Sequence, residues 1–110
     1  MGAPLYDTNI LINLMRDSVD TIEGSTTSLN LIEFPKAAKL KGLKVIVPGR
    51  DDYDLAFELA SLLLKKGSPI PAVDLVIAAV AMNRNMTLQT TDRHFEMIQK
   101  VNDNLALKMA

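Results

Sequence analysis

Hydrophobic and polar positions divide the chain into short extended runs and longer stretches with helical spacing. Short apolar or β-branched runs at 4–6, 44–47 and 86–91 predict strands, and 105–107 fits an edge strand. Apolar residues recur every three or four positions over 10–15, 29–34, 55–63 and 95–101, which predicts helices. Because strands and helices alternate, we expect an α/β fold with a central, mostly parallel sheet flanked by helices on both faces.

Some segments carry weaker or mixed signals. Residues 24–27 indicate a turn or the start of a short strand, and the basic segment 36–44 extends the helical stretch around Glu33 to near Gly42. The nearly all-apolar run from Leu75 to Met82 predicts a helix that is buried on most sides. The buried face of the helix that follows Pro48-Gly49 should consist of Leu55, Leu59, Leu62 and Leu63.

Composition narrows the class of protein and the chemistry open to it. The chain has 110 residues, which predicts a single domain over 1–110. A formal net charge of −1 argues against a strongly basic coat for nucleic acid. The chain has no cysteine and one histidine, so thiol chemistry and paired-histidine metal sites are excluded. A metal site would rest on carboxylates, which select hard cations such as magnesium, manganese or calcium.

The sequence gives no indication of a membrane or a secretory segment. No stretch without a charged residue is longer than the nine residues between Asp74 and Arg84, whereas a membrane span needs about 20. The first residues lack a basic region followed by an apolar run, so they do not form a secretory signal. We therefore expect a cytoplasmic protein that does not associate with membranes.

Four carboxylates carry the functional signal. Asp7 and Asp92 each follow a predicted strand and open a helix, and Asp74 begins a helix after a proline-marked loop. Parallel strands end at one edge of the sheet, where α/β proteins bind ligands. Taken singly, the aspartates are explained as helix caps, and Glu33 as solvated or paired with Lys36. If the four acids converge on one edge, their repulsion requires a cation or raised pKa values.

Four sequence strings around these acids resemble the motifs of PIN-domain nucleases, in the same order and at similar spacing. LYDTNILINL contains Asp7, SLNLIEF contains Glu33, and PIPAVDLVIAAVA contains Asp74. LQTTDRHFEMI supplies Thr90, Asp92 and Phe95 as a T-x-D-x-x-F element. Within that family the chain is most similar to VapC-type toxins of prokaryotic toxin–antitoxin pairs. The resemblance implies a PIN-like three-layer sandwich with a central parallel sheet.

The resemblance also implies a chemistry. Asp7, Glu33, Asp74 and Asp92 would hold Mg²⁺ or Mn²⁺, and a metal-activated water would hydrolyse RNA to leave a 5′-phosphate and a 3′-hydroxyl. Asp7 and Asp92 are the candidate direct ligands, and Glu33 and Asp74 would bind directly or through water. Thr8, Asn9 and Thr90 would position carboxylates or substrate. The implied partners are RNA, an antitoxin protein and a second copy in a homodimer.

Two other functions stay open at this stage. The chain is short for the PIN family, which favours a catalytically silent module that binds RNA or protein. The segment between residues 17 and 27 is compressed, which affects the expected substrate preference and partner docking more than the chemistry. The intact set of four acids favours the enzyme. A phosphoryl-accepting receiver domain ranks last, because the strand at 44–47 ends in Pro48-Gly49 rather than in an aspartate.

Other charged residues have simpler interpretations. Lys36, Lys39, Lys41 and Lys44 form a solvated face, with guidance of RNA phosphates as the alternative. Asp51, Asp52 and Asp54 are charges at a helix start, with a second metal site as the minor alternative. We interpret His94 as a residue on the helix surface, with contact to substrate or to a metal-bound water as the alternative.

Overall fold

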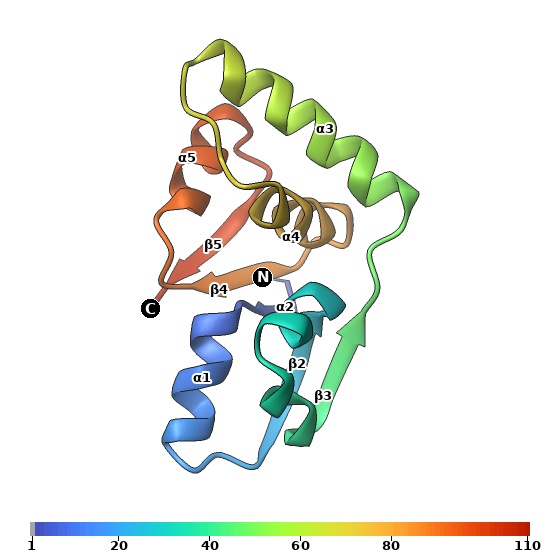
Figure 1. Ribbon diagram of the computed structural model, residues 1–110, viewed down its shortest axis with the longest axis vertical. Coiled ribbons are helices and arrows are strands. Elements are labelled where there is room, and N and C mark those ends of the chain that lie inside the picture. Colours follow the sequence, from blue (N-terminus) through green and yellow to red (C-terminus); the bar gives the residue numbers. More distant parts are fainter. Residues whose placement is uncertain (1) are drawn as a thin grey trace.

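The computed structural model describes residues 2–110, which form one five-stranded sheet between two layers of helices (Figure 1). The strands are β1 (Pro4–Tyr6), β2 (Thr21–Thr27), β3 (Lys41–Ile46), β4 (Thr87–Thr90) and β5 (Ala106–Met109). The helices are α1 (Thr8–Arg16), α2 (Ser28–Glu33), α3 (Arg50–Lys65), α4 (Ala72–Asn83) and α5 (His94–Val101). A 3-10 helix, η1 (Pro35–Lys39), lies between α2 and β3.

The sheet has the order β3-β2-β1-β4-β5, and all its strand pairs are parallel. The α/β prediction with a parallel sheet is therefore confirmed. Strand β1 lies at the centre, where Leu5 is opposite Ser25 of β2 on one side and Leu88 of β4 on the other. Because all strands run the same way, the carboxyl ends of β1 and β4 meet at one edge.

Alternation along β1 builds a core on each face of the sheet. Leu5 belongs to the larger core, which is formed with α3, α4 and α5, whereas Tyr6 belongs to the core under α1 and η1. These two groups of helices lie on opposite sides of the sheet (Figure 1). Residues 75–81 of α4 are all buried, which confirms the prediction for this helix. Within residues 2–110, no helix is both long and apolar enough to cross a membrane.

Two predictions in the first half of the chain need correction. Residues 24–27 are strand, one of the two predicted alternatives, but they end the seven-residue strand β2 rather than start it; β2 is paired on both sides and contains a register shift between Thr21 and Gly24. The helix does not continue to near Gly42, because α2 ends at Glu33 and β3 begins at Lys41. Pro35 accounts for this end, since it lacks an N–H and keeps Phe34 out of helical geometry (φ −142°, ψ 78°).

Smaller corrections concern α3 and α5. Leu62 is 38% exposed, because the buried face of α3 follows Asp52, Ala56, Leu59 and Leu63 instead. The last helix begins at His94, so Asp92 lies in the loop before it. The predicted edge strand is present as β5, which pairs with β4.

Candidate metal centre

Asp7 lies at the carboxyl end of β1 and caps α1. Its side chain is 5% exposed and is surrounded by hydrogen-bond donors. Oδ1 accepts from the Thr8 N–H at 2.9 Å and from Asn30 Nδ2 at 3.0 Å. Oδ2 accepts from the Thr90 hydroxyl at 2.7 Å and from Asn9 Nδ2 at 3.5 Å. The protein therefore fixes the orientation of this carboxylate from the interior.

Asp92 follows β4, and the loop around it is tied to the Asp7 segment. The Asp92 N–H donates to Thr90 Oγ1 at 2.9 Å, and Thr90 in turn holds Asp7. The Thr91 N–H donates to Asn9 Oδ1 at 3.1 Å. Parallel pairing of β1 with β4 brings the two strand ends together, so Asp7 and Asp92 share the expected edge.

Asp74, Asp92 and His94 form the tightest group of possible metal ligands among residues 2–110. One ligand atom from each lies within 4.8 Å of the others. His94 Nδ1 is 3.1 Å from Asp74 Oδ2 and 3.5 Å from Asp92 Oδ1. His94 does lie on the surface of a helix, as predicted, but it also has two acidic partners that the prediction did not include. His94 is the first residue of α5, and its imidazole contacts Asp74 in the first turn of α4.

Glu33, like Asp7, is not one of the three side chains whose ligand atoms lie within 4.8 Å of one another. It ends α2 and is exposed. The Thr8 hydroxyl donates to Glu33 Oε1 at 2.9 Å, and Thr8 directly follows Asp7. The structure thus connects Glu33 to the Asp7 segment through a hydrogen bond rather than through a shared ligand position.

The pKa of Asp74 reports the electrostatics of this edge. Burial raises the pKa of Asp74, the hydrogen bond with His94 lowers it, and the charges of Asp92 and Asp7 raise it, with a net increase. The site therefore carries negative charge that the protein does not fully neutralise. Two carboxylates and one imidazole nitrogen within 4.8 Å suit a small divalent cation, because opposite ligands of six-coordinate magnesium lie about 4 Å apart. Two carboxylates and one imidazole form a donor set that can hold a divalent cation.

Asn30 is a functional candidate that the sequence analysis missed. It is completely buried in α2, and its amide contacts Asp7, Thr8 and Thr27. One sequence signal pointed to part of this arrangement. Thr27 and Asn30 have the spacing of a capping box at the start of a helix, and the structure contains that box. The contacts with Asp7 and Thr8 join segments more than twenty residues apart, which no local pattern reveals.

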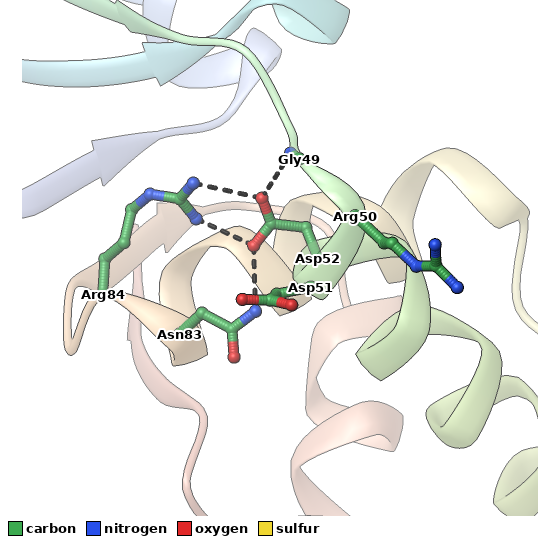
Figure 2. Close-up of a pocket in the computed structure, with 6 residues that line it drawn as sticks. All are labelled: Gly49, Arg50, Asp51, Asp52, Asn83 and Arg84. Carbon is green, nitrogen blue, oxygen red and sulfur yellow. Dashed lines mark hydrogen bonds and ion pairs between the residues drawn. The ribbon is translucent and has the colours of Figure 1, made fainter.

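Figure 2 shows a separate pocket beside the start of α3, away from the carboxylate edge. Asp52 is almost fully buried there and accepts from Arg84 Nη1 at 2.8 Å and Nη2 at 3.1 Å, from Asn83 Nδ2 at 2.9 Å and from the Gly49 N–H at 2.8 Å. Burial alone would raise the pKa of Asp52, but these hydrogen bonds and the Arg84 charge bring it below its ordinary value. The Arg84 guanidinium already compensates the buried Asp52 charge, so this pocket joins α3 to α4 rather than binding metal.

Comparison with solved structures identifies the fold. The chain is similar to a chain of VapBC2 from Rickettsia felis bound to a promoter DNA fragment, with 23% identity, 96% and 97% of the two chains covered and a TM-score of 0.77. It is similar to DNA-bound VapBC from Salmonella typhimurium (20% identity, 99% and 98% covered, TM-score 0.76). A third likeness is to VapBC-5 from Mycobacterium tuberculosis (19% identity, both chains fully covered at 100%, TM-score 0.75).

Sequence comparison adds nothing to this result. No protein-family model matches the chain, and no curated protein matches it in sequence. At these low identities the structural likenesses show the fold. They cover the whole chain at high TM-scores, and the predicted PIN-like α/β fold is confirmed.

Proposed function

We propose that the protein is a metal-dependent ribonuclease of the VapC type, the toxin component of a toxin–antitoxin pair. The observation that carries this proposal is the gathering of Asp74, Asp92 and His94 at the carboxyl edge of the sheet, with Asp7 near enough for its charge to contribute to the raised pKa of Asp74. The fold adds support, because the similar structures are VapBC toxin–antitoxin complexes.

The residues have distinct roles in this proposal. Asp74 and Asp92 bind Mg²⁺ or Mn²⁺ directly, and Asp7 presents a carboxylate whose orientation its four donors fix. A bound divalent cation lowers the pKa of a water molecule and neutralises charge on the scissile phosphate. Glu33 would hold the ion directly or through water. Thr8, Asn9 and Thr90 orient the carboxylates, and the products carry a 5′-phosphate and a 3′-hydroxyl.

The partners follow from the same proposal. An unrestrained ribonuclease would damage the cytoplasm in which we place it, so an antitoxin protein should cover the carboxylate edge or its entrance. The similar VapBC structures contain toxin and antitoxin together, which supports a partner of that kind. We also propose a homodimer. RNA is the proposed substrate. The exposed Lys36 and Lys39 follow Glu33 closely in the chain, so they are candidates to contact the RNA phosphates.

Cleavage of RNA by the purified protein tests the proposal. The assay compares end-labelled RNAs in Mn²⁺, Mg²⁺ and EDTA. Asp74→Asn serves as the inactive variant, and Asp51→Asn as the matched control at an exposed aspartate outside the site. We expect metal-dependent cleavage by the wild type and the control and a loss of at least a hundredfold in Asp74→Asn. Cleavage that persists in EDTA, or equally in Asp74→Asn, would contradict the proposal. A folded wild type that neither binds metal nor cleaves RNA would indicate the silent binding module.

A further inference from the structure

The buried amide of Asn30 has only one orientation that satisfies its neighbours. The Thr27 backbone N–H lies 3.3 Å from one end of the amide, and a backbone N–H can only donate. That end must therefore be the Oδ1 oxygen, which also accepts from the Thr27 hydroxyl at 2.6 Å. The Nδ2 group is consequently directed at Asp7 Oδ1 and at Thr8 Oγ1, both 3.0 Å away.

This orientation determines the direction of the next hydrogen bonds. Thr8 Oγ1 accepts a hydrogen from Asn30, so its own hydroxyl hydrogen is free to donate to Glu33 Oε1 at 2.9 Å. A single amide thus places one donor on Asp7 and, through Thr8, one donor on Glu33. In this series of hydrogen bonds each residue donates to the next, from Thr27 to Asn30, from Asn30 to Thr8 and from Thr8 to Glu33.

A second short chain holds the other oxygen of Asp7 in the same way. The Asp92 backbone N–H donates to Thr90 Oγ1, so the Thr90 hydroxyl hydrogen is directed to Asp7 Oδ2 at 2.7 Å. Each Asp7 oxygen therefore accepts from a side chain whose donor direction is determined by a backbone N–H group: that of Thr27 for Asn30, and that of Asp92 for Thr90. Among residues 2–110 no buried side-chain nitrogen or oxygen lacks a partner, so the arrangement is complete.

We propose that Asn30 is a positioning residue that holds the carboxylates of Asp7 and Glu33 in the orientation required for cation binding. The inference rests on the proposed function, since it concerns the same metal site. Helix capping alone does not explain the residue. The cap requires the Asn30 N–H and Oδ1 on Thr27, whereas Nδ2 contacts Asp7 and Thr8, which lie outside the helix.

Manganese binding to the folded protein distinguishes positioning from a general loss of stability. Titration with MnCl₂ is followed by calorimetry at a temperature where circular dichroism shows each variant folded. Asn30→Ala removes the donors to Asp7 and Thr8. Thr26→Val is the matched control, because Thr26 is fully buried in the neighbouring strand and its hydroxyl donates to the Tyr6 backbone carbonyl at 2.8 Å rather than to a carboxylate.

We expect Asn30→Ala to weaken Mn²⁺ binding about tenfold or more and Thr26→Val to change it less than twofold. A double-mutant cycle with Asp7→Asn and Glu33→Gln tests the route of the effect. In the variant that lacks both carboxylates, Asn30→Ala should no longer change the Mn²⁺ affinity. A residue with a purely structural role would give the same loss in both backgrounds.

The outcomes separate this inference from the proposed function. If the wild type binds Mn²⁺ and folded Asn30→Ala binds it equally well, the positioning role is overturned and the proposed function is unaffected. A tenfold loss that persists without the two carboxylates overturns it as well. If the wild type binds no Mn²⁺, both the proposed function and the positioning role fail. If Mn²⁺ binds and Asn30 acts as expected but no RNA is cleaved, only the proposed ribonuclease activity fails.

Discussion

Asp7 and Asp74 show how the same residue type is treated differently within one site. Asp7 is nearly buried and receives hydrogen bonds from four groups. Asp74 has one hydrogen-bonding side-chain partner, His94, and its negative charge is repelled by the like charges of Asp92 and Asp7. One carboxylate is therefore fixed by the protein, and the other retains unbalanced negative charge. A cation site needs both properties, because ordered ligands lower the cost of binding and excess charge attracts the ion.

Asp74→Asn should stabilise the protein in EDTA. The pKa of Asp74 is raised in the folded state, so between the unfolded value near 3.9 and the folded value the folded state binds more protons. Stability from this group is complete below the unfolded pKa and is lost as the pH rises through the folded pKa. At neutral pH we expect Asp74→Asn to be more stable by about 1 kcal/mol, the repulsion of two charges about 5 Å apart in water.

Urea denaturation in EDTA at pH 4 and pH 7 measures this effect. The free-energy difference between Asp74→Asn and the wild type should be larger at pH 7 than at pH 4. Asp51→Asn, at an exposed position outside the site, should show no such increase. A variant that is less stable than the wild type at pH 7 would show that Asp74 is not under electrostatic strain.

At this scale the sequence predicted some residues and missed others for physical reasons. Asp7, Asp74 and Asp92 lie next to strand or helix starts, where local patterns place them at the sheet edge. The contact of His94 with Asp74 was not predicted, because Asp74 lies twenty residues earlier on another helix. Asn30 has polar partners on α1 that only the folded chain brings close.

A buried ion pair between Arg84 and Asp52 joins two helices, because Arg84 lies at the end of α4 and Asp52 at the start of α3. Asp52 is 1% exposed, so its charge depends on Arg84 for compensation (Figure 2). Arg84→Met should lower the free energy of unfolding by about 3 kcal/mol, because it leaves a buried charge without its partner. Arg50→Met is the matched control. Arg50 and Asp54 form an exposed pair at 3.8 Å, whose loss should cost less than about 0.5 kcal/mol.

Thermal or urea denaturation of the two arginine variants provides the comparison. The pKa of Asp52 is lowered, so its stabilising contribution is present above the unfolded pKa and disappears as the pH falls through the folded value. Arg84→Met should therefore lose less stability on acidification than the wild type does. Equal losses for Arg84→Met and Arg50→Met would contradict the structural role of the buried pair.

Gly24 allows β2 to pass close to β1. Its φ is +133°, and a Cβ added there would lie 2.5 Å from Cε2 of Tyr6. The Tyr6 hydroxyl donates to the Glu23 carbonyl at 2.7 Å, so the ring cannot move away freely. Gly24→Ala should cost about 1–3 kcal/mol in urea denaturation. Gly49→Ser, at a helix cap with open space around it, should cost nothing, and an equal loss there would refute this explanation.

The elements also show where local patterns fail. The continuous apolar run of α4 and the helical spacing of apolar residues in α5 identified these helices, because residues 75–81 are all buried and α5 buries Phe95 and Ile98. The β2 strand has little apolar pattern, since its sequence TIEGSTT is held by pairing with two neighbouring strands. Such pairing is tertiary information. Pro35 does indicate that α2 ends before it, because a proline disfavours helical geometry at the preceding residue. The apolar spacing around it had favoured a longer helix.

The topology of the whole molecule explains why residues as far apart as Asp7 and Asp92 meet. All five strands are parallel, and β1 and β4 are adjacent, so their carboxyl ends open at one edge. The connection from α1 to β2 takes only residues 17–20, yet the fold covers the full length of the similar VapBC chain from Mycobacterium tuberculosis. The compressed segment therefore leaves the sheet and its carboxylate edge intact.

Anomalous diffraction locates manganese in crystals of the protein. Crystals soaked in MnCl₂ would be measured near the manganese absorption edge, with Asp74→Asn crystals treated identically. We expect an anomalous peak among Asp7, Asp74 and Asp92 in the wild type and its loss in the variant. No peak at this edge, or peaks only at exposed acids such as Asp51 and Asp54, would contradict a metal centre at the carboxyl end of the sheet.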